Sequence, residues 1–130
     1  MYNKNPKEEY FIKNWKKLNK RERKALSANV SFFNISISST HKLTVAFLKE
    51  FEYQMHWEAY SLTGIITEDI LINFKHKLNV SSVLCRNNYP QKFLIDNMVL
   101  LREYIPVIVQ TQKLTLNAKL RLQTFYELIS

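Results

Sequence analysis

Apolar residues recur along the chain at helical spacing, in short runs that polar turns separate. Within residues 8–26, Phe11, Trp15 and Leu18 fall at i, i+4 and i+7, a pattern that predicts one amphipathic helix over this range. Pro6, just before the range, is a typical start signal for a helix. We therefore expect an amphipathic helix over about residues 8–26.

Beyond this helix the pattern repeats with a period of about two dozen residues. Residues 44–66 and 67–89 form segments of equal length that both start with threonine, and Phe51 of the first corresponds to Phe74 of the second. The next segment fits with two extra residues, and residues before 44 give apolar positions in similar places. The expected units cover residues 19–43, 44–66, 67–89, 90–114 and 115–130.

Each unit has the features of two short helices. A threonine, or Pro90 in one unit, stands where a helix N-cap or first-turn residue belongs. Apolar residues at helical spacing follow, then a second apolar cluster and a polar turn. Because neither helix can bury its apolar face alone, neighbouring units must stack. We predict one all-α domain over residues 1–130, either a short helical-repeat solenoid or a compact bundle of short helices.

Two segments favour a different fold class. Residues 30–38 and 106–116 alternate apolar and polar positions and are rich in β-branched residues, as strands are. If they pair, the domain is α+β. The repeat alignment places both segments where a second helix is expected, so we favour the all-α fold.

The repeat also resembles a known kind of sequence. The pattern F-L-x-x-F-x-x-x-x-x-W-x-x-x-S, followed by K-L-T or K-L-S before the next unit, is similar to short tandem repeats in proteins of large DNA viruses, some phages and some bacteria. It covers residues 40–90 well and the rest of the chain loosely. The resemblance implies a helical repeat scaffold and no chemistry. The residues that carry it are Lys42, Leu43, Thr44, Phe47, Leu48, Phe51, Trp57 and Ser61.

The chain is strongly basic, with a net charge of +8 and a sequence pI near 9.6. This charge favours acidic partners, which include nucleic acid and acidic protein surfaces. The cations gather in the first predicted helix, where they could bind phosphates with Trp15 stacking on a base. They could equally be the solvated face of a helix whose Trp15 belongs to the core. The candidate binding residues are Lys13, Lys16, Lys17, Lys20, Arg21, Arg23 and Lys24.

The sequence offers little support for catalysis. Gly64 is the only glycine, so the glycine-rich phosphate loops and nucleophile turns of common enzyme families are absent. The histidines and Cys85 do not have the spacing of metal ligands. We therefore expect no enzyme activity, no catalytic residue, no metal and no cofactor. A single cysteine and the lack of any long apolar run favour a cytoplasmic protein with no membrane span.

The last predicted unit ends in an apolar cluster of Phe125, Leu128 and Ile129. Repeat arrays normally end in a polar cap, so this cluster predicts an interface with a partner or with a second copy of the chain. The resemblance to viral and phage repeats, together with a Lys-, Asn- and Ile-rich composition, implies a phage- or virus-encoded factor that binds and occludes a host protein. The alternative is a nucleic-acid-binding protein that acts through its first helix.

Overall fold

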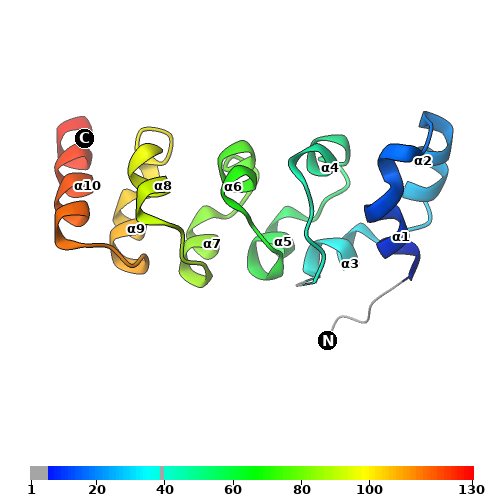
Figure 1. The fold of residues 1–130 in the computed structure, drawn as a ribbon, viewed down its shortest axis with the longest axis horizontal. Coiled ribbons are helices and arrows are strands. Elements are labelled where there is room, and N and C mark those ends of the chain that lie inside the picture. The colour runs from blue at the N-terminus through cyan, green and yellow to red at the C-terminus, as the bar shows by residue number, and fades with distance from the viewer. Residues whose placement is uncertain (1–5, 39) are drawn as a thin grey trace. The chain divides into compact units, whose positions relative to one another are not determined.

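The computed structural model describes residues 6–38 and 40–130, and this part of the chain is all-α with no strand. The prediction of an all-α fold is therefore confirmed. Where the sequence predicted one domain over residues 1–130, contacts within the chain define two compact units, Met1–Ile65 and Ile66–Ser130. Both units consist of short helices joined by tight turns (Figure 1).

Five α-helices and one 3₁₀ turn make up the described part of the first unit. They are α1 (Pro6–Asn14), η1 (Trp15–Lys17), α2 (Lys20–Ser27), α3 (Phe32–Ile37), α4 (Val45–Glu50) and α5 (Trp57–Thr63). The prediction of one helix over residues 8–26 is wrong, because the chain leaves the helical conformation at Leu18 and starts α2 after Asn19. The sequence around Asn19 provides the physical reason, which we describe with the basic surface below.

The second unit also has five α-helices and one 3₁₀ turn. They are α6 (Glu68–Phe74), α7 (Val80–Arg86), α8 (Gln91–Asp96), η2 (Arg102–Tyr104), α9 (Ile105–Thr111) and α10 (Leu116–Ile129). The alternative of strands near residues 30–38 and 106–116 is wrong for the described residues, because these segments form α3 and α9. Their apolar residues pack on neighbouring helices, and this burial outweighs the preference of β-branched residues for strands.

The first helix of each pair starts at the residue that the repeat pattern predicted. Thr44, Thr67, Pro90 and Thr115 are the N-cap residues of α4, α6, α8 and α10. The Thr44 and Thr115 hydroxyls accept hydrogen bonds from the N–H groups of Phe47 and Ala118, at 3.1 and 3.2 Å. Such a bond satisfies a backbone donor that has no partner within the helix.

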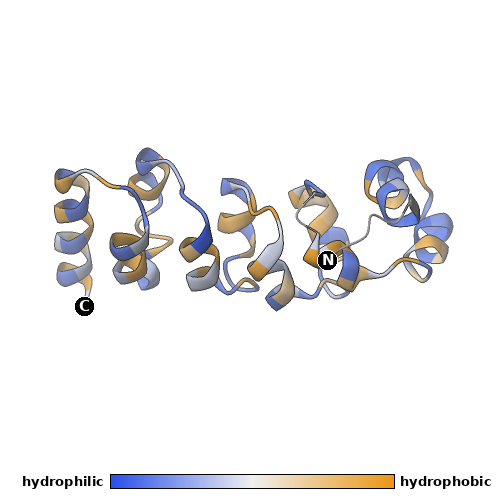
Figure 2. Ribbon diagram, turned by 90° about the horizontal axis from the view of Figure 1, so that it is seen from below, coloured by the Kyte–Doolittle hydropathy of each residue, from blue (hydrophilic) through white to orange (hydrophobic). Residues whose placement is uncertain are grey.

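The fourth residue after each of the first three of these N-caps lies deep in the core. Leu48, Leu71 and Leu94 all have 0% of their surface exposed. Full burial of one leucine contributes about 2 kcal/mol of hydrophobic stabilisation. Helices of six or seven residues are marginal in isolation, so this packing, more than helix propensity, holds them in place. Hydrophobic and hydrophilic residues accordingly alternate along the ribbons of both units (Figure 2).

The two cores differ in composition. The first unit has an aromatic cluster in which neighbouring ring centroids lie 4.8–6.2 Å apart. Its members are Phe11, Trp15, Phe32, Phe47 and Phe51. The second unit relies on aliphatic residues, and α7 packs on α9 while α10 packs on α8 and α9.

Tyr89 joins successive helix pairs of the second unit by hydrogen bonds. Its hydroxyl donates to the Ile66 carbonyl at 2.8 Å, and its backbone N–H donates to Gln112 Oε1 at 2.8 Å. Burial raises the pKa of Tyr89 to about 12, Arg86 opposes this shift and Glu68 adds to it. The neutral phenol is therefore the form that the folded chain requires.

We expect Tyr89→Phe to make the chain less sensitive to alkaline pH. An unfolded tyrosine titrates near pH 10, so the raised pKa in the folded state stabilises the protein fully below about pH 10. That contribution is lost as pH rises from about 10 to about 12. Urea unfolding across this range should show a steeper loss of stability in the wild type than in Tyr89→Phe. Tyr53→Phe, at a residue 89% exposed, is the matched control and should behave as wild type. Equal pH dependence of all three proteins would contradict the role of Tyr89.

Candidate binding surfaces

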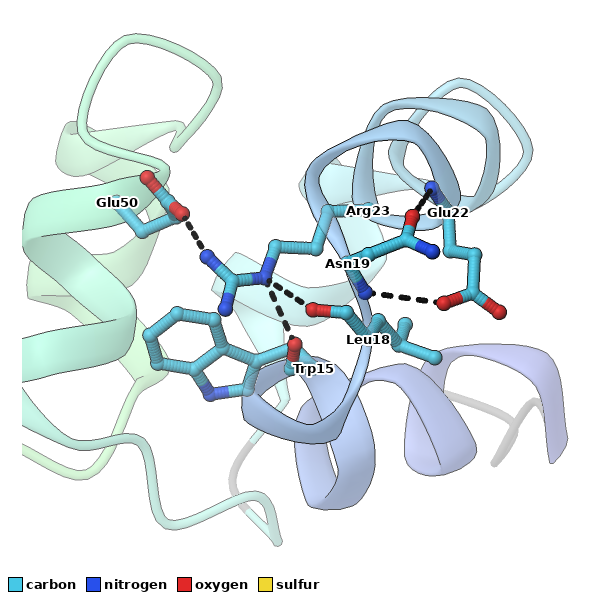
Figure 3. Close-up of polar contacts among 6 residues, drawn as sticks. All are labelled: Trp15, Leu18, Asn19, Glu22, Arg23 and Glu50. Carbon is cyan, nitrogen blue, oxygen red and sulfur yellow. Dashed lines mark hydrogen bonds and ion pairs between the residues drawn. The ribbon is translucent and has the colours of Figure 1, made fainter.

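The predicted basic helix is divided by a capping box at the start of α2. Asn19 Oδ1 accepts from the Glu22 N–H at 2.9 Å, and Glu22 Oε1 accepts from the Asn19 N–H at 3.0 Å (Figure 3). These two bonds satisfy donors at a helix start and so stabilise a new helix at this point. The basic residues are therefore distributed over α1, η1 and α2.

Arg23 differs from the other cations of this segment because it holds three elements together. Its Nε donates to the Trp15 and Leu18 carbonyls, both at 3.0 Å. Its Nη1 lies 2.8 Å from Glu50 Oε1 on α4, and its guanidinium carbon lies 5.2 Å from the centroid of the Trp15 ring. Figure 3 shows the side chain reaching over the indole towards α4. These contacts give Arg23 a structural role within the unit.

The remaining six cations are exposed to solvent, and we call them the basic surface. They are Lys13, Lys16, Lys17, Lys20, Arg21 and Lys24. Residues 13–24 contain seven cations and one carboxylate, so they carry +6 of the net charge of +8. Lys13 Nζ lies 3.4 Å from Glu9, and Lys16 Nζ lies 5.8 Å from the Trp15 ring. The basic surface can therefore attract a polyanion.

Trp15 is part of the core of the first unit. It is 8% exposed and makes edge-on contacts with Phe47 and Phe51, at centroid distances of 5.8 and 5.7 Å. Of the two interpretations of Trp15 that the sequence left open, the structure supports the core residue. An indole buried in this way cannot stack on a nucleic-acid base.

The apolar residues predicted as an interface lie on α10 with unequal exposure. Leu128 is 80% exposed, Ile129 is 45% exposed, and Phe125 is half-buried. Leu116 and Leu120, on the same helix, are 71% and 51% exposed. The four exposed leucine and isoleucine side chains therefore give α10 an apolar surface that faces solvent.

Sequence reasoning missed a groove beside this surface, between α9 and α10. The groove has a volume of about 440 Å³ and combines apolar side chains with amide and carboxylate groups. Its lining residues are Ile105, Pro106, Val109, Gln110, Gln123, Tyr126 and Glu127. The repeat pattern contained a signal for it, because Val109 and Tyr126 take the positions of Leu84 and Leu101, which are buried.

The groups that could carry chemistry are dispersed. Cys85 is a free, exposed cysteine, His41 is 7% exposed, and His56 is the N-cap residue of α5. Within residues 6–38 and 40–130, His, Cys, Asp and Glu side chains form no group of three that could hold a metal ion. None of the helices in the described part of the chain combines the length and the apolar character needed to cross a bilayer.

Comparisons of the chain with models of protein families, with curated proteins and with solved structures find no match. The functional argument therefore depends on the surfaces described above.

Proposed function

We propose that the chain is a non-enzymatic binding module that covers part of an acidic protein partner with its basic surface. The observation that carries this proposal is the exposure of six cations on α1, η1 and α2, within a segment of net charge +6. The helices hold these cations in place before binding, which lowers the entropy cost of association.

Apolar groups beside the cations favour a protein over a nucleic acid. Tyr10 is 54% exposed and lies three residues before Lys13 on α1, so the two side chains share one helix face. Exposed tyrosines are typical of protein interfaces, where an apolar centre is bordered by polar groups. The resemblance to viral and phage repeats, with the composition, supports a phage- or virus-encoded factor that acts by occluding a host protein.

Nucleic acid is the second candidate, since the same cations match the charge of a phosphate backbone. A salt series tests this second candidate, because binding to duplex DNA falls steeply with salt as counterions are released. If six cations contact phosphates, the slope of log affinity against log salt should be about −5. A slope near zero for duplex DNA would exclude this second candidate.

We expect replacement of Lys16, Lys17, Lys20 and Arg21 by serine to abolish capture of the partner. The control variant replaces four exposed cations of the second unit, Lys92, Arg102, Lys113 and Arg121, and loses the same amount of charge. The measurement is quantitative mass spectrometry of proteins captured from a host lysate, with and without nuclease. Wild type and control should capture the same protein regardless of nuclease, and the basic-surface variant should not. Equal capture by both variants would refute the proposal, provided that circular dichroism shows both to be folded.

A further inference from the structure

At the places equivalent to the groove between α9 and α10, one earlier in each unit, the next helix of the chain packs against one of the two walls. In the first unit α5 packs on α3, and the N–H of His56, its N-cap residue, donates to Ser36 Oγ at 3.0 Å. Ser36 is five residues after the N-cap of α3 and is 0% exposed. Met55, eleven residues after the N-cap of α4, is 6% exposed.

In the second unit, the residues at the same two positions of α7 and α8 are also buried. Leu84 and Leu101 occupy the equivalent positions, five residues after the N-cap of α7 and eleven after that of α8. Because α9 packs on α7, these two residues are 1% and 0% exposed. Their counterparts in the last groove are Val109, which is half-buried, and Tyr126, which is 37% exposed. The last groove therefore has the walls of the repeat, and within the described residues no further helix packs into it.

We propose that this groove binds α1 of a second copy of the chain. Helix α1 is of the type that packs at the equivalent places. Like α9, it precedes a helix whose N-cap side chain accepts a hydrogen bond, and it has one fully buried residue about two turns before that N-cap, Phe11 in α1 and Ile108 in α9. Moreover, α1 contacts the start of α3 through Glu8, which accepts a hydrogen bond from the Ser31 N–H at 2.9 Å.

The exposed side of α1 also complements the groove chemically. Tyr10, 54% exposed, offers an aromatic ring to the apolar Pro106 and Val109. The Lys13 side chain is 70% exposed and can meet Glu127 at the edge of the groove. Such an apolar centre with a charged border is typical of stable interfaces. The groove and α1 are different surfaces of the described part of each copy, so the contact is head-to-tail.

The experiment measures molar mass by sedimentation and light scattering over a range of protein concentrations. Wild type should exceed the 15.5 kDa of one chain as concentration rises. Val109→Lys, in the groove, and Tyr10→Ser, on α1, should each remain monomeric. The matched controls are Val99→Lys and Tyr53→Ser, at residues 55% and 89% exposed outside the groove and α1, and they should associate as wild type does.

Mixing the two defective variants provides the decisive result. Val109→Lys retains an intact α1 and Tyr10→Ser retains an intact groove, so the mixture should form a complex of two chains and grow no further. A monomeric wild type at every concentration, association that persists in either variant, or a mixture that stays monomeric would each overturn the proposal. The basic-surface variant leaves Tyr10, Lys13 and the groove unchanged, so it should associate as wild type does while it loses capture of the partner, and the two proposals can fail separately.

Discussion

Replacing Leu94 by alanine is expected to lower the free energy of unfolding of the second unit by about 3 kcal/mol. Leu94 lies on the six-residue helix α8 and is 0% exposed. Truncation removes its buried methyl groups and leaves a cavity that so short a helix cannot close without losing its other contacts. Urea unfolding followed by circular dichroism measures this loss.

The control for Leu94→Ala is Leu120→Ala. Leu120 is 51% exposed on α10, so its truncation leaves no buried cavity and should change stability by less than about 0.5 kcal/mol. If the two variants unfold at the same urea concentration, burial of the fourth residue after the N-cap does not stabilise the fold as we expect.

Gln112→Ala is expected to lower the free energy of unfolding by a similar amount, about 3 kcal/mol. Gln112 is 5% exposed, and its Nε2 donates to the Leu84 and Asn87 carbonyls, both at 2.8 Å. Its Oε1 accepts from the Tyr89 N–H at 2.8 Å. Alanine would leave three backbone groups without their partner at the end of α7, and each unsatisfied buried group is costly.

Gln110→Ala provides the comparison for Gln112→Ala. Gln110 lies two residues earlier on α9 and is exposed at the edge of the groove, so the same truncation there removes no buried hydrogen bond. Thermal and urea unfolding should show Gln110→Ala close to wild type. A similar loss in both variants would show that the effect of Gln112→Ala does not come from its buried hydrogen bonds.

The starts of the first helices could be predicted from the sequence because each has a local signal. Thr44, Thr67 and Thr115 each precede a short apolar run, and Pro90 has a backbone angle suited to a helix start. A threonine or proline at a helix start affects the backbone only within about one turn of its own position. Their effect therefore depends on neighbours that are visible in the sequence.

The end of the first helix at Leu18 could not be predicted from the apolar stripe. Phe11, Trp15 and Leu18 have helical spacing up to the break, and Ala25 and Leu26 continue the stripe after it, so periodicity predicts one helix. The signal that was missed is the pair Asn19 and Glu22, which has the spacing of a capping box. Here a local capping interaction prevails over an apolar pattern that continues through it.

Parts of the candidate sites depend on three-dimensional packing and leave no local signal. Arg23 has the same charge as its neighbours in the sequence, and only the fold brings it to Glu50 and the Trp15 ring. Likewise Val109 resembles its covered counterpart Leu84, and their different exposure follows from whether a helix packs against them. The sequence therefore predicted the basic segment, but it did not show that Arg23 has a structural role while the other cations are exposed.

The brevity of the helices has a consequence for how such a chain can diverge. Each helix pair needs one capping group and a few inward-facing apolar residues, as Thr44, Leu48 and Met55 illustrate. The outward-facing positions are under no such requirement. Substitutions there can change the charged and apolar groups that a target would meet without changing the backbone fold. A lineage built on this unit can therefore follow a changing target without first having to find a new fold.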